Sequence, residues 1–258
     1  MNQVPKLRPS QTSQAVVTPL GEQAWRLVIP AGPSGHYRLA QLDDYGSLPR
    51  RKFYWQPPFH LKVKARTSHE TIPGTWGFGL WNDPFGMAIM SGAEVLRLPA
   101  LPNTIWFFFA SQKNYLSLRD DIPASGPLAA TFQSPRIPGL LLGLAVPLAP
   151  LLAFRPGVRW LRSLARKVVH QDAVSLAELK QTDWHTYEFE WRAQEAVFWL
   201  DGVQILQTYI VPKGPLGLVL WIDNQYAALA PSGRVGFGTE PNPETAWIEL
   251  ADLDYGKA

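Results

Sequence analysis

The sequence predicts an all-β protein whose antiparallel strands pack as a sandwich, and three observations indicate this class. Within residues 184–202, the aromatic residues Tyr187, Phe189 and Trp191 alternate with polar residues, which is the period of a half-buried strand. A second apolar run follows and ends in Asp-Gly at 201–202, a pair that favours a tight turn. Proline (24 residues) and glycine (20) are frequent while only 17% of residues are charged, as expected for many short strands joined by turns.

Further short strands are expected along most of the chain. Residues 1–22 look like a loose N-terminal leader. After them the pattern predicts strands at 22–29, 37–42, 53–55, 59–66, 75–82, 105–110, 203–209, 216–222, 234–238 and 245–255. Residues 105–110 have no polar face, so we expect them at the centre of a sheet. A chain of 258 residues, 46% of them hydrophobic, can form one real core, and we expect a single sandwich domain over 23–258.

One segment breaks the β pattern. Between Arg136 and Arg155 lies an uncharged run of 18 residues, and residues 158–169 then place apolar side chains on one helical face and basic ones elsewhere. We therefore expect an apolar and basic helical insertion at about 136–180. The favoured interpretation is a lid, formed by 137–169, over the mouth of the sandwich. A peripheral membrane contact is the main alternative, and a membrane-spanning helix is disfavoured by three prolines in the run.

Composition excludes several classes of site. The chain has no cysteine, so it has no disulfide, thiolate nucleophile or cysteine-based metal site. Its five histidines lack the spacing of metal ligands, and we expect no metal and no cofactor. The formal net charge of +3 does not suggest a nucleic-acid partner. The polar N-terminus lacks the apolar core of a signal peptide, which leads us to expect a cytoplasmic protein.

Three stretches resemble family 16 glycoside hydrolases of the concanavalin A-like lectin/glucanase superfamily. Residues 184–202 resemble the late strands of that family, 59–81 an earlier pair, and 247–255 the final strand. The resemblance implies a two-sheet antiparallel jelly roll with a concave ligand face. Members that cleave sugars carry a Glu-x-Asp-x-x-Glu or Glu-x-Asp-x-Glu strand that supplies both catalytic carboxylates. In the corresponding region, 87–98, Glu94 is the only acid, so hydrolase activity is not carried over.

Two strand ends share a Trp-x-Asp pattern, Trp81 with Asp83 and Trp221 with Asp223. Alternation places each Trp and its Asp on one strand face. If both strands line the concave face, the carboxylates lie at the rim of a stacking surface and form a candidate catalytic pair, with pKa values pushed apart. The candidate ligand-binding residues are Trp76, Trp81, Asn82, Trp106, Trp221, Asn224 and Tyr226. In the alternative interpretation, which turn chemistry favours, the Trp residues are core and the Asp residues form turns.

The first expected function is binding of a hydrophobic or amphipathic, glycolipid-like small molecule in a concave aromatic pocket under the lid. Gly77 and Gly79 lie on the same strand face and leave room beside the backbone. Whether the protein also converts the ligand is open. If it is an enzyme, we expect an acid/base isomerase, cyclase or lyase that needs no cofactor. Two alternatives remain, a lectin-like carbohydrate-binding module and a non-standard glycoside hydrolase.

Overall fold

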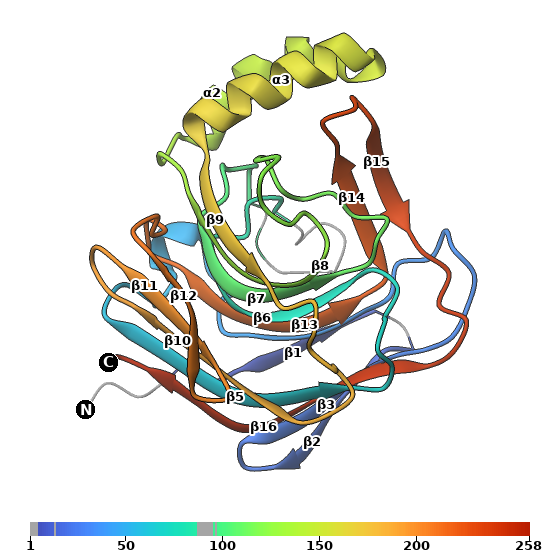
Figure 1. Ribbon diagram of the computed structural model, residues 1–258, viewed down its shortest axis with the longest axis vertical. Helices are drawn as coiled ribbons and strands as arrows, with labels where there is room; N and C mark the ends of the chain where they lie inside the picture. Colours follow the sequence, from blue (N-terminus) through green and yellow to red (C-terminus); the bar gives the residue numbers. More distant parts are fainter. Residues whose placement is uncertain (1–4, 13, 87–94, 96) are drawn as a thin grey trace.

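The structure is a sandwich of two seven-stranded antiparallel sheets (Figure 1). The computed structural model describes residues 5–12, 14–86, 95 and 97–258. One sheet has the strand order β1-β4-β13-β6-β7-β8-β9, and the other has the order β12-β11-β10-β5-β16-β3-β2. A separate hairpin, β14–β15, lies beside the insertion. The predicted all-β antiparallel jelly-roll sandwich is confirmed.

We call the first sheet the concave sheet, because it curves around the side of the molecule that carries the helices (Figure 1). It contains β1 (Arg8–Gln11), β4 (Leu39–Asp43), β6 (Thr75–Trp81), β7 (Thr104–Ala110), β8 (Gly126–Gln133), β9 (His170–Ser175) and β13 (Gly217–Asp223). The outer sheet contains β2 (Val16–Gly21), β3 (Ala24–Ile29), β5 (Phe59–Thr67), β10 (His185–Trp191), β11 (Ala196–Leu200), β12 (Val203–Thr208) and β16 (Ala246–Gly256). The hairpin consists of β14 (Gln225–Leu229) and β15 (Val235–Thr239), and a 3-10 turn, η1 (Arg50–Lys52), precedes β5.

The main core lies between the two sheets and follows the alternation of the strands. Tyr187 of β10 is fully buried, and its ring contacts Phe78 of β6 at 5.2 Å and Phe107 of β7 at 5.0 Å between centroids. Asp201 and Gly202 form the turn between β11 and β12, and their φ angles are positive, 50° and 80°. Such a two-residue turn matches the twist of a hairpin, as the Asp-Gly pair predicts.

Several strands differ from the sequence prediction. The expected loose leader contains β1, which pairs with β4, and β2, which pairs with β3. Residues 53–55 form only an isolated bridge, from Trp55 to Leu216. The strands β8, β9 and β14 were not predicted. β1, β2 and β9 are edge strands, where only one side is paired and an alternating apolar pattern is not required.

The helical insertion is shorter than the predicted 136–180, because β9 already belongs to the concave sheet. It consists of α2 (Gly139–Leu142), η2 (Gly143–Ala153) and α3 (Arg155–Val168), and it lies on the concave side of the concave sheet (Figure 1). In α3 the buried side chains are Val158 and Arg162. Among the helices formed by the described residues, none is both long enough and apolar enough to cross a membrane.

The apolar side chains of the insertion are largely exposed rather than buried against the sheet. The exposed set, which we call the apolar ridge, is Leu140, Leu141, Leu144, Leu152, Phe154, Trp160 and Leu164. Pro147 and Pro150 lie within η2 and keep this run from forming one regular helix that could present a single face to the sheet. The structure therefore does not show the expected burial of the run against the concave aromatics, and the lid stays a prediction.

Candidate functional site

Three tryptophans meet on the concave face. Trp81 of β6, Trp106 of β7 and Trp221 of β13 lie with ring centroids 5.6–6.4 Å apart. The planes of Trp81 and Trp221 are 6° from parallel. Phe108 extends the cluster, 4.9 Å from Trp106 and 5.7 Å from Trp221. Trp81 and Trp221 therefore lie on the same face of the concave sheet, which was the condition for a shared aromatic surface, and Trp106 joins them.

Glycines on the concave face leave room for these rings. A Cβ atom on Gly77 would lie 3.0 Å from the indole of Trp221 and 2.3 Å from the carbonyl oxygen of Phe107. A Cβ atom on Gly217 would lie 2.3–2.7 Å from atoms of Tyr45. The space expected beside the backbone is thus occupied by the protein's own aromatic side chains. What remains for a ligand is the outer side of the rings, and Trp81 and Trp106 keep part of their surface exposed.

Polar groups hold the tryptophans in place. The Nε1 of Trp81 donates to the hydroxyl of Tyr45 at 2.6 Å, and the Nε1 of Trp221 donates to Oγ1 of Thr75 at 3.0 Å. Gln41 lies directly opposite Trp221 in the register of β4 and β13, and its side chain donates to Asp43 at 2.8 Å. Gln41 is partly exposed, so one edge of the aromatic cluster carries an amide beside a carboxylate.

Asp223 ends β13 on the same face and is buried in a network of donors. It accepts hydrogen bonds from the hydroxyl of Thr75 at 2.8 Å and from the hydroxyl of Tyr37 at 3.2 Å. The backbone N–H groups of Thr75 and Gln225 also donate to it, each at 3.2 Å. Burial raises the pKa of the Asp223 carboxyl to about 7, while these hydrogen bonds act in the opposite direction.

Asp83 belongs to a different environment. Its carboxylate accepts a hydrogen bond from Nη1 of Arg97 at 3.0 Å, and both side chains are buried. Arg97 also donates to the carbonyl oxygens of Tyr45 and Leu48, each at 2.7 Å, so the ion pair fixes the loop after β4. The positive φ of Asp83, 47°, marks it as the turn residue that the alternative interpretation describes.

The two acids do not share a site, contrary to the prediction of a catalytic pair. Strands β6 and β13 are antiparallel, with Trp81 opposite Gly217 and Thr75 opposite Asp223. The C-terminal ends of such strands point in opposite directions, so Asp83 and Asp223 lie at opposite ends of the strand pair. The six-residue offset between Thr75 and Trp81 alone corresponds to roughly 20 Å.

The remaining predicted ligand-binding residues lie outside the aromatic cluster. Trp76 points into the core between the sheets, where it stacks on Phe109 at 3.5 Å. The side chain of Asn82 bonds to the backbone of Leu101 and Asn103, at 2.8 and 3.0 Å. Asn224 is fully buried and bonds to the backbone of Arg38, His36 and Glu240. Tyr226 lies on β14 under the ammonium of Lys113, 4.7 Å from the ring centroid. Trp76, Asn82 and Asn224 thus have structural roles.

Residues that sequence reasoning missed are Tyr37, Gln41 and Tyr45. The segment Leu-Ala-Gln-Leu-Asp of β4 alternates, and its two polar residues fall on one face. That alternation was the available signal for Gln41. No local pattern indicates that Tyr45 lies against Trp81, because their contact depends on strand order.

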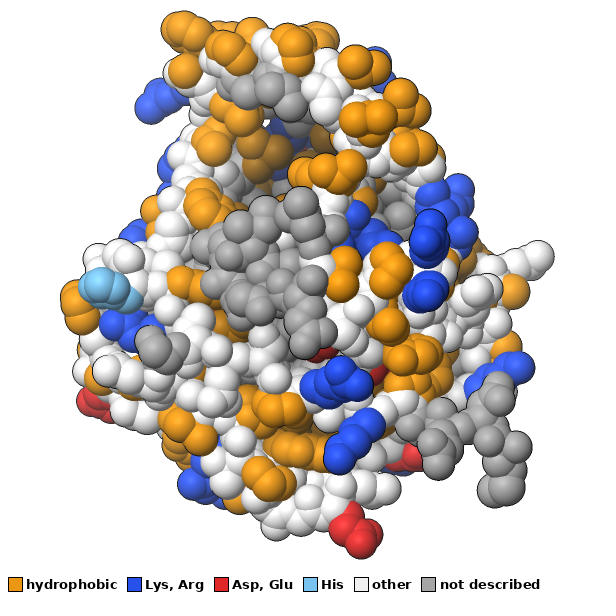
Figure 2. Space-filling model, turned by 180° about the vertical axis from the view of Figure 1, so that it is seen from behind, with side chains coloured by type: hydrophobic (Ala, Val, Ile, Leu, Met, Phe, Trp, Pro, Cys, Tyr) orange, Lys and Arg blue, Asp and Glu red, His pale blue; other side chains and the backbone are white. Residues whose placement is uncertain are grey.

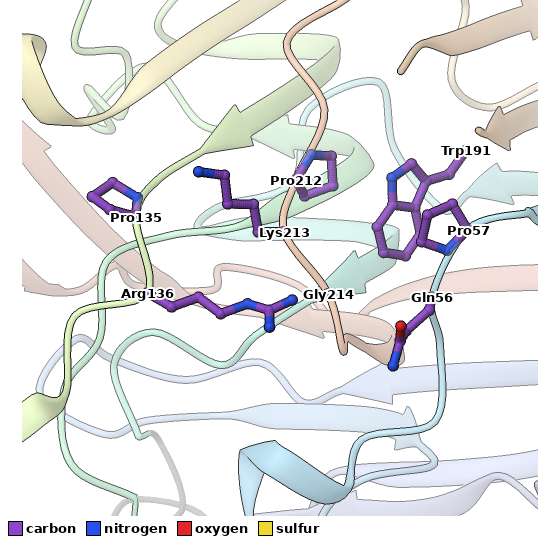
Figure 3. A pocket seen from close by; sticks show the side chains of 8 residues that line it. All are labelled: Gln56, Pro57, Pro135, Arg136, Trp191, Pro212, Lys213 and Gly214. Atoms are coloured by element: carbon purple, nitrogen blue, oxygen red, sulfur yellow. The ribbon is translucent and has the colours of Figure 1, made fainter. Parts of the chain in front are cut away.

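Apart from the aromatic cluster, a basic pocket of about 460 Å³ lies at one end of the sandwich. It is lined by Gln56, Pro57, Pro135, Arg136, Trp191, Pro212, Lys213 and Gly214. Figure 3 shows the guanidinium of Arg136 reaching toward the loop that carries Gly214, with the indole of Trp191 on the other side. Trp191 is only 1% exposed, so this pocket offers two cations but no aromatic face for stacking.

The comparisons with known proteins concern the fold. No protein-family model and no curated protein sequence matches the chain. A legume lectin-like domain from Entamoeba histolytica is 11% identical, with a TM-score of 0.48 over 98% of this chain and 90% of that one. A family 16 endo-glucanase from Bacteroides ovatus is 9% identical, with a TM-score of 0.48 over 97% and 94%. The β-glucanase of Bacillus licheniformis is 11% identical, with a TM-score of 0.45 over 100% and 94%.

At such identities the likeness does not extend to activity. Glu94, the only acid of the segment compared with the catalytic strand, lies outside the described residues.

Proposed function

We propose that the concave face binds carbohydrate, with Trp81 and Trp106 as stacking surfaces. The observation that carries the proposal is the clustering of three indoles on one sheet face, two of them partly exposed. The apolar C–H face of a pyranose ring packs on an aromatic plane, while its hydroxyls need hydrogen-bonding groups at the edge of that plane. Gln41, hydrogen-bonded to Asp43 and placed opposite Trp221, supplies such a group.

A hydrophobic ligand, our first expectation from the sequence, has less support. On the concave face, a small pocket beside Trp106 and Phe108 has room for about one water molecule. An exposed aromatic surface with polar neighbours suits a ligand that stays partly hydrated, and sugars are such ligands.

The test is a glycan screen followed by affinity measurements on variants. The full chain is screened against immobilised β-glucans and shorter oligosaccharides, and the Kd of each retained glycan is measured by titration calorimetry. Trp81→Ala and Trp106→Ala should each weaken binding at least about tenfold, since aromatic anchors dominate recognition. Trp184→Ala is the matched control, because Trp184 is 42% exposed but packs on Arg66, 4.8 Å from the ring centroid.

Two outcomes would contradict the proposal. One is the absence of any retained glycan with a folded wild-type protein. The other is a glycan that Trp81→Ala and Trp106→Ala bind as tightly as the wild type does. Its binding site would then lie elsewhere, and the basic pocket with Arg136 and Lys213 would be the next region to test.

A further inference from the structure

The apolar ridge of the insertion is a large exposed hydrophobic surface. Its seven side chains are between 43% and 78% exposed, with Leu140, Leu144 and Phe154 the most exposed. Figure 2 shows hydrophobic side chains gathered along the edge of the molecule formed by the insertion. So many exposed apolar side chains on one element are uncommon on a monomeric protein and mark an interaction site.

The charged residues within the insertion are all basic. Residues 122–171 contain no Asp and no Glu. Arg155, Arg159 and Lys167 are exposed, and among the described residues none of the three forms an ion pair with an acid. The surface therefore combines exposed leucine and aromatic side chains with uncompensated positive charge.

The insertion is held to the body by a buried arginine. Arg162 of α3 is 3% exposed and donates to the carbonyl oxygens of Ser117 at 2.6 Å and Leu229 at 2.8 Å. It also pairs with Asp120 at 2.7 Å, and Asp120 pairs with Arg166. These contacts use the inner side of α3, so Trp160 and Leu164 stay on the outside. The ridge is consequently presented outward from a fixed base.

We propose that the apolar ridge docks onto the surface of an anionic lipid membrane. Leucine, phenylalanine and tryptophan side chains enter the boundary between headgroups and acyl chains, and Arg155, Arg159 and Lys167 lie near the lipid phosphates. Charge complementarity selects this occupant. A second copy of the chain would bring the same basic residues together, whereas an anionic bilayer supplies both an apolar layer and the opposite charge. The contact is peripheral, since none of the helices in the described residues is suited to cross a membrane.

The first experiment is flotation of the full chain with two kinds of vesicle, phosphatidylcholine alone and phosphatidylcholine mixed with phosphatidylglycerol. The wild type should float with the anionic vesicles and bind the neutral ones at least about tenfold more weakly. High salt should weaken binding to the anionic vesicles, because dissolved ions screen the attraction between the basic residues and the lipid headgroups. Failure to float with the anionic vesicles at low salt would overturn the proposal.

Variants separate the two parts of the surface. Leu140→Ser combined with Leu144→Ser should reduce binding to anionic vesicles at least about tenfold, through the loss of buried apolar area. Arg159→Gln combined with Lys167→Gln should weaken it and reduce its salt dependence. The matched control is Leu20→Ser combined with Val203→Ser, on outer-sheet residues that are 52% and 66% exposed.

Sedimentation tests the competing occupant. One outcome is a dimeric wild type that the double variant Leu140→Ser with Leu144→Ser converts to a monomer, with vesicle binding unchanged. In that case the ridge is an interface between two copies, and the membrane proposal is wrong. A monomeric wild type whose vesicle binding is lost in the same variant supports the proposal. Retained circular dichroism of the β sandwich shows in each case that the variant is folded.

Discussion

Trp81 and Trp221 lie 6.4 Å apart between ring centroids, with planes 6° from parallel, although they come from distant parts of the chain. Their strands are neighbours in the concave sheet, and glycines on that face make room for the rings. At Gly77, a Cβ atom would lie 3.0 Å from the indole of Trp221. The arrangement of the proposed sugar-binding surface therefore depends on a residue with no side chain.

Gly77→Ala should destabilise the protein and move Trp221. The new Cβ atom would lie 2.3 Å from a backbone oxygen of Phe107, a neighbour that cannot rotate away. Overpacking of this kind costs about 1–3 kcal/mol of the free energy of unfolding, measured by urea denaturation. Gly143→Ala is the control, because a Cβ atom there meets nothing within 4 Å. Equal stability of the two variants would show that the sheet adjusts more easily than its packing implies.

The buried ion pair of Asp83 and Arg97 should be costly to break from one side. Arg97→Met removes a buried cation that pairs with the carboxylate of Asp83, and we expect a loss of about 3–5 kcal/mol in the free energy of unfolding. The double variant Arg97→Met with Asp83→Asn should recover part of this loss, since the buried negative charge is removed together with the positive one. If the double variant is less stable than Arg97→Met, the carboxylate of Asp83 is stabilised by other contacts.

The alternation of residues predicted much of this site. Parity in β6 and β13 places Trp81 and Trp221 on one face, and parity also explains why Trp76 is absent, since it lies five residues before Trp81 and faces the core. Strand order was not predictable from local pattern. Asp83 and Asp223 looked equivalent in sequence, yet an antiparallel pairing of their strands separates them.

The insertion illustrates the same limit. Its position, its helical character and its basic residues follow from the sequence, whereas the direction of the apolar side chains does not. That direction depends on Arg162. Its charge predicts an exposed position, but its guanidinium makes three hydrogen bonds to the body of the protein, to Ser117, Leu229 and Asp120. A buried arginine on a helix that exposes Trp160 and Leu164 reverses the expected orientation.

The protein should not cleave β-glucans. The segment 87–98 carries one acid, Glu94, and a retaining glycosidase needs two carboxylates close together. We expect the protein to release no reducing sugar from laminarin or lichenan, even at protein concentrations high enough to bind a glycan measurably. Release that disappears in Glu94→Gln would establish a hydrolase and would require a second acid from another strand.

Stability should fall as the pH rises from about 4 to 7, because of two buried acids. Burial raises the pKa of Asp223 and of Asp44 from 3.8 to about 7 in the folded protein. In this interval the folded chain holds both protons while the unfolded chain has released them, so the free energy of unfolding decreases with pH. The decrease is on the order of a few kcal/mol for each carboxyl. Thermal unfolding followed by circular dichroism across this interval measures it.

Variants assign this slope to its source. Asp223→Asn and Asp44→Asn should each flatten the dependence of Tm on pH between 4 and 7, since the amide has no proton to release. In Asp223→Asn, the amide oxygen still accepts from Thr75, and the hydroxyl of Tyr37 turns to accept from the new NH₂ group. Asp121→Asn is the control. Arg119 lowers the pKa of Asp121 to about 2, so this exposed acid titrates below the interval and its removal should leave the slope unchanged. A slope that persists in both buried-site variants would mean that neither carboxyl is protonated in the folded protein near neutral pH.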